Sequence, residues 1–89
     1  MQTKQLLLMC RSLTYAQRTA KALERKGITG VVTRAPKSAS PNGCGYCVIV
    51  SPRRGKQAVR ILRDAGLEPV RMMLRSEDGS LREADDDLS

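Results

Sequence analysis

The sequence predicts an α+β domain with a ferredoxin-like βαββαβ order, in which two helices cover one face of a four-stranded antiparallel sheet. Two observations predict it. Two apolar runs fit central strands, and the pattern strand, helix, glycine, strand occurs twice along the chain. In that repeat Gly27 matches Gly66 and Leu23 matches Leu62, both at an offset of 39 residues. We therefore expect two similar halves packed into one sheet.

The first half is predicted from residues 4 to 34. Residues 4–10 form an apolar run that fits a strand buried on both faces. Ser12 or Thr14 is expected to cap a helix, whose apolar positions recur at steps of three and four residues. Gly27 ends this helix, because glycine readily takes the left-handed backbone that follows a helix. Residues 28–34 are rich in β-branched side chains and predict the second strand.

The second half begins after an irregular connection. Residues 35–43 contain two prolines, two serines and an Asn-Gly pair, which are typical of a loop. Residues 45–51 predict the second central strand. A Ser-Pro pair at 51–52 is typical of a helix start, and Gly66 is expected to end that helix. Residues 67–74 predict the last strand.

The polar residues in two of these strands indicate how the sheet is ordered. Strands 4–10 and 45–51 are strongly apolar, so we expect them to be central and parallel to each other. Strands 28–34 and 67–74 contain arginines and a proline, which are typical of sheet edges. Such open edges also favour pairing with a second copy, so a homodimer is one expected partner arrangement.

Composition limits the chemistry of this chain. Its 89 residues suit one domain, and it contains no His, which excludes His-based catalysis and imidazole zinc sites. Residues 1–74 carry 14 Lys and Arg against three Asp and Glu, whereas residues 75–89 are acidic. We expect a basic domain over 1–74 and a disordered acidic tail over 75–89. The short chain and the lack of His favour a small carrier or binding module over a stand-alone enzyme.

The start of the chain predicts its location. The apolar run at 6–10 is too short for a membrane span and lacks the features of a signal peptide. We therefore expect a cytoplasmic protein without a membrane partner. Three cysteines in such a chain are expected to be reduced thiols rather than a disulfide framework.

Cys44 is the candidate reactive residue. It lies between Gly43 and Gly45, and the missing Cβ atoms would let another molecule approach the thiol closely. Arg53 and Arg54 are cations that would favour the thiolate if the fold brings them near. The alternative is that Cys44 is only a small residue in a tight turn.

The other two cysteines are expected to be structural. Cys47 completes a Cys-x-x-Cys motif with Cys44, but strand geometry would separate the two by about 10 Å, too far for a disulfide. Cys47 is thus expected to be a small buried apolar residue, with a resolving thiol as the alternative. The repeat places Cys10 level with Ile49, roughly 16 Å from Cys44, which predicts a core thiol. Two thiols without imidazole supply only half of the ligands of zinc, so no metal is expected.

The segment Ser40–Gly45, with sequence SPNGCG, carries a family resemblance. A Ser/Pro-rich stretch followed by Cys-Gly, between the second and third strands, resembles the small bacterial family of selenium/sulfur carrier protein-like domains over residues 4–74. The resemblance implies that Cys44, beside Gly45, carries sulfur or selenium as a persulfide or selenosulfide. It also implies donor and acceptor proteins as partners, and no cofactor is expected. Cys47, the strong positive charge and the acidic tail depart from the family pattern.

Two other functions fit the same sequence. A basic ferredoxin-like domain suits RNA binding, but such domains stack bases on several aromatic residues of the central strands, and only Tyr46 is available there. Nucleic acid is therefore a less favoured partner. A regulatory domain that binds a small metabolite is the other alternative, although no ligand motif supports it. The Arg and Lys residues of the helices are expected to be solvated, with a docking surface as the alternative.

Overall fold

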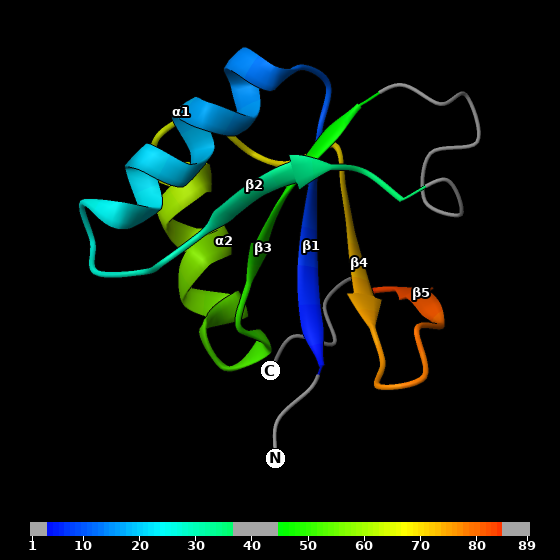
Figure 1. Ribbon diagram of the computed structural model, residues 1–89. Helices are drawn as coiled ribbons and strands as arrows, with labels where there is room; N and C mark the ends of the chain where they lie inside the picture. Colours follow the sequence, from blue (N-terminus) through cyan, green and yellow to red (C-terminus); the bar gives the residue numbers. More distant parts are fainter. Residues whose placement is uncertain (1–3, 37–44, 85–89) are drawn as a thin grey trace.

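The structure is a computed structural model and describes residues 4–36 and 45–84. The elements in chain order are β1 (Gln5–Cys10), α1 (Leu13–Glu24), β2 (Val31–Arg34), β3 (Tyr46–Val50), the 3-10 helix η1 (Pro52–Arg54), α2 (Gly55–Asp64), β4 (Arg71–Arg75) and β5 (Leu81–Glu83). Both long helices cover the same face of one sheet (Figure 1). The α+β class and the two helices on one face are as predicted.

The sheet differs from the prediction in its number of strands. It has five strands in the order β2-β3-β1-β4-β5, and every neighbouring pair is antiparallel. The prediction of four strands was wrong because β5 lies in the segment 75–89, which was expected to be a disordered tail. β4 was predicted to be an edge strand, but it lies between β1 and β5, while β2 is an edge as expected.

The direction of β3 also corrects the prediction. β1 and β3 are central, but they run antiparallel, with Leu6 opposite Val50 and Cys10 opposite Tyr46. The reason lies in the connections. The helical crossover through α1 returns the chain parallel to β1 in β2, and the next connection then reverses it into β3. The start of β3 therefore lies beside the end of β1.

The helix boundaries follow from local chemistry. The Ser12 hydroxyl oxygen accepts a hydrogen bond from the Tyr15 amide at 3.1 Å, which makes Ser12 the N-cap of α1, as predicted. Gly27 follows the helix with φ +83°, the left-handed conformation expected there. Pro52 begins η1 as expected, whereas Ser51 makes no capping hydrogen bond through its side chain. A single turn of 3-10 helix thus precedes α2.

The core has two parts, one on each face of the sheet. On the helix-covered face, Leu6 and Leu8 of β1 pack with Leu23 of α1 and Leu62 of α2, and all four are fully buried. Burying a leucine side chain contributes roughly 1.5–3 kcal/mol. The opposite face has a smaller cluster, which consists of Leu7, Met9, Cys47 and Met73. β1 is therefore buried on both faces, as its apolar run predicts.

Two further features of the described residues concern membrane and protein partners. Among the described residues, neither helix is long and apolar enough to cross a membrane. β2 lies at an edge of the sheet, and Val31 on it is exposed. Pairing of this edge with a second copy stays a prediction.

Candidate functional site

The candidate site is the stem that leads from β2 into β3. Cys44 and Gly43 lie outside the described residues, and Gly45 is the first described residue after them. Gly45 has φ +117°, a backbone conformation that residues with a side chain rarely adopt. Its carbonyl oxygen accepts a hydrogen bond from the Ala35 amide at 3.2 Å. This bond closes the stem, so the residue to which Cys44 is bonded has a fixed place at the end of the sheet.

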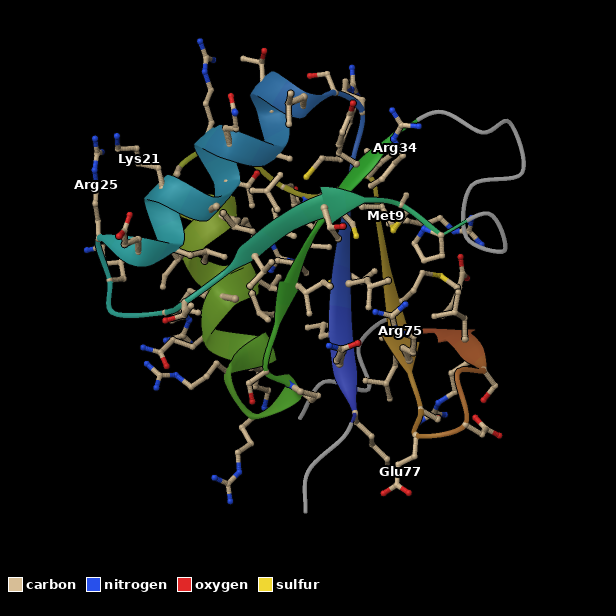
Figure 2. All side chains as sticks on the ribbon, in the orientation of Figure 1. Met9, Lys21, Arg25, Arg34, Arg75 and Glu77 are labelled. Carbon is tan, nitrogen blue, oxygen red and sulfur yellow. The ribbon has the colours of Figure 1, made fainter. Side chains whose placement is uncertain are left out.

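A cation–π contact lies on this stem. Arg34 and Tyr46 face each other across β2 and β3, and the guanidinium carbon of Arg34 lies 6.0 Å from the centre of the Tyr46 ring. At this distance a guanidinium is attracted to the ring face. Figure 2 shows Arg34 at the same end of the sheet as Met9. The pair places a positive charge next to Tyr46, the first residue of β3.

Cys47 lies on the helix-free face of the sheet and is fully buried. Burial raises the pKa of its thiol, the charge of Arg75 partly opposes the rise, and the nearby Cys10 adds to it. Arg75 is held in place by Gln5, whose side-chain oxygen accepts hydrogen bonds from Nε at 2.9 Å and Nη2 at 2.7 Å. The Cys47 thiol is therefore protonated and shielded, as expected of a small buried residue.

Cys10 lies on the opposite, helix-covered face. It is buried, and its thiol donates to the Leu8 carbonyl oxygen at 3.5 Å and to the Thr19 hydroxyl oxygen at 3.8 Å. Burial raises its pKa more than the Thr19 contact lowers it. Its expected position was wrong, because it pairs with Tyr46 and not with Ile49. Cys10 is nevertheless a core thiol, as predicted.

Arg53 and Arg54 lie in η1, after the far end of β3. The five residues of β3 span about 16 Å between Gly45 and this turn. Both arginines are exposed, and the Arg54 Nε donates a hydrogen bond to Gln57 at 3.2 Å. The structure instead places Arg34 at the stem, opposite Tyr46.

One comparison with known proteins found a match. The family described as "Putative Se/S carrier protein-like" matches residues 5–73. The chain belongs to this family. Searches of curated proteins and of solved structures found no match.

All three cysteines of this Se/S carrier-like chain lie in the matched range, whereas β5 lies beyond it. Within residues 4–36 and 45–84, no three His, Cys, Asp or Glu side chains gather as metal ligands would. Two features of the site were missed from sequence: the contact of Arg34 with Tyr46 and the effect of the Arg75 charge on the pKa of Cys47. Both depend on cross-strand register, for which the sequence carries no direct signal.

Proposed function

We propose that this Se/S carrier-like chain carries sulfur or selenium and that Cys44 is the accepting thiol. The observation that carries the proposal is the burial of the other two thiols. Cys10 and Cys47 are both shielded, and burial raises the pKa of each. A thiol that exchanges groups with another protein must meet its partner as a thiolate. Elimination thus favours Cys44, and the family match supports a carrier role for the chain.

The proposed step needs no oxidant or cofactor. The Cys44 thiolate attacks the outer sulfur of a persulfide on a donor protein, R–S–SH. A new S–S bond forms on Cys44, the S–S bond of the donor breaks, and the donor leaves as the thiolate R–S⁻. Transfer to an acceptor repeats the exchange with Cys44 as the leaving thiolate. The number of electrons is conserved at every step.

The stem supports this chemistry in two ways. Gly45, with its positive φ, lets the chain turn directly beside Cys44 without a Cβ in the way. Arg34 contributes a positive charge to the same end of β3, which favours a thiolate nearby. We further propose that the chain is a carrier without catalytic activity of its own, that it acts in the cytoplasm, and that donor and acceptor proteins are its partners.

The order β2-β3-β1-β4 with both helices on one face supports the ferredoxin-like arrangement for the first four strands.

The structure disfavours the RNA-binding alternative. RNA-binding domains with a ferredoxin-like fold stack bases on the helix-free face of the sheet. Tyr46 instead packs against the helix-side core and contacts Arg34. The RNA-binding alternative therefore loses its one stacking residue. A redox role with Cys47 as resolving thiol is disfavoured by the burial of Cys47.

The test is the mass of the intact protein after incubation with glutathione persulfide. We expect the wild-type chain to gain one sulfur atom, and Cys44→Ser to gain none. Cys47→Ala and Cys10→Ala are the matched controls, and both should load like the wild type because their thiols are shielded. A Cys44→Ser protein that still gains a sulfur atom on another thiol would contradict the proposal.

A further inference from the structure

A groove runs beside α1, between this helix and the connection from α2 to β4. Its volume is about 390 Å³. We call it the α1 groove. Its lining has three cations, which are Arg18 and Lys21 of α1 and the C-cap residue Arg25, and three apolar residues, which are Ala22, Ala65 and Leu67.

The three cations form one row. Arg18, Lys21 and Arg25 are spaced at i, i+3 and i+7, which places them on the same side of the helix over about 10 Å of its length. All three are exposed, and within the described residues none of them forms a salt bridge. Figure 2 shows Lys21 and Arg25 pointing away from the sheet. Their charges are available to a partner.

The acidic residue of α1, Glu24, does not line the α1 groove. Glu24 lines a different hollow, on the flank of α1 that faces β2, together with Gln17 and Thr29. Lys21 lines both hollows. The α1 groove itself therefore has three positive charges and no acidic residue in its lining.

Two hydrogen bonds fix the turn that forms the apolar side of the groove. The Leu67 amide donates to the Leu62 carbonyl oxygen at 2.8 Å, which fixes the turn after α2. The Tyr15 hydroxyl donates to the Gly66 carbonyl oxygen at 3.4 Å and ties this turn to α1. Leu67 is half-buried, so one side of it remains open to the groove. A partner meets a preformed surface and does not have to order it.

We propose that the α1 groove docks an acidic helical segment of a donor or acceptor protein, an inference that rests on the proposed carrier function. A helix with carboxylates at i, i+4 and i+7 presents three charges over the same length as the row of cations. One apolar side chain of that helix packs against Leu67 and Ala22. Charge complementarity of this kind mainly speeds encounter and sets the orientation of docking.

The chemistry of the surface favours an acidic protein over a nucleic acid. The two aromatic residues of the chain are Tyr15 and Tyr46, and neither lines the groove. The hydroxyl of Tyr15 is bonded to Gly66, and the ring of Tyr46 lies under Arg34. Single-stranded nucleic acid binds through base stacking as well as charge, and no ring is available for it here.

The test uses the full chain and a labelled helical peptide of about 18 residues, roughly five turns, with Glu at i, i+4 and i+7 and Leu beside them. A peptide with Gln in place of each Glu and a labelled oligouridylate serve as comparison probes. One variant combines Arg18→Glu, Lys21→Glu and Arg25→Glu. Its matched control combines Arg53→Glu, Lys56→Glu and Arg60→Glu, which change the net charge equally on exposed positions outside the groove.

We expect the groove variant to bind the Glu peptide at least about tenfold more weakly than wild type, and the control variant less than about threefold more weakly. Equal loss in both variants would mean non-specific attraction and overturn the proposal. So would equal binding of the Gln peptide, tighter binding of the oligouridylate, or no binding of the Glu peptide at low salt. Loading by glutathione persulfide is measured separately in the wild type and in the groove variant, and we expect both to gain one sulfur atom. A wild-type chain that binds the Glu peptide but gains no sulfur atom would reject the carrier function alone.

Discussion

Gly30 lies in the connection between α1 and β2 and packs against Val48 of β3. A Cβ atom at this position would lie 2.6 Å from the Cγ1 of Val48, well inside normal contact distance. Val48 is fully buried, and its β-branched side chain has few alternative rotamers with which to move aside. We expect Gly30→Ala to lower the free energy of unfolding by about 1–3 kcal/mol through overpacking, measured by urea denaturation.

The control for this prediction removes the other side of the clash. Val48→Ala alone destabilises by leaving a cavity, but it also takes away the Cγ1 atom that the new Cβ would meet. The double variant should therefore lose less stability than the sum of the two single variants. Strictly additive losses would show that the two positions do not clash.

At the scale of elements, the helices were predictable because each carries its own signals. Ser12 and Gly27 bound α1 in the structure much as the sequence indicates. β5 was missed because it has only three residues and one apolar side chain, Leu81, among acidic neighbours. Its pairing with β4 depends on tertiary contacts, and no local pattern reports them.

Burial of Ala84 makes the docking of β5 testable. Ala84 belongs to the helix-side core, and its amide donates to the Met72 carbonyl oxygen at 2.9 Å. We expect Ala84→Asp to lower the free energy of unfolding by about 1–3 kcal/mol, because a carboxylate there must be buried or must detach the segment. Urea denaturation measures the loss, and hydrogen exchange of the amide of residue 84 reports detachment.

Arg82→Asp is the matched control, because it places the same carboxylate on an exposed position of β5. This change should alter stability by less than about 0.5 kcal/mol. Equal effects of the two substitutions would contradict the docked position of β5, and would favour the disordered tail that the acidic composition predicts.

For the whole molecule, strand direction decides which thiols lie at the same end of the sheet. The charge and apolar patterns predict the class of fold, but a repeat of strand and helix does not state whether β1 and β3 run together or opposed. The mistaken direction moved Cys10 to the wrong end, although its burial was predicted correctly. The reactivity of Cys44 stays a prediction, because that residue lies outside the described part of the chain.

The buried thiols also link the stability of the whole molecule to pH. Burial raises the pKa of Cys10 and Cys47 in the folded chain above the ordinary value of a thiol. Above about pH 8.5 the unfolded chain therefore loses protons that the folded chain keeps. The unfolded state is favoured as a result, and stability must fall as pH rises. Below the ordinary thiol pKa both states are protonated, and these groups add no pH dependence.

We expect the free energy of unfolding to fall as pH rises above about 8.5, with a slope that approaches at most about 1.4 kcal/mol per pH unit for each thiol. Urea denaturation at several pH values measures this slope. The double variant Cys10→Ala/Cys47→Ala loses stability at every pH because it leaves small cavities, but it should show a shallower slope. The two proteins differ only at these two positions, so the difference between the slopes belongs to the two thiols. Identical slopes would mean that these thiols titrate in the folded protein as they do in the unfolded chain. Their pKa values would then give no reason to favour Cys44 over them as the transfer thiol.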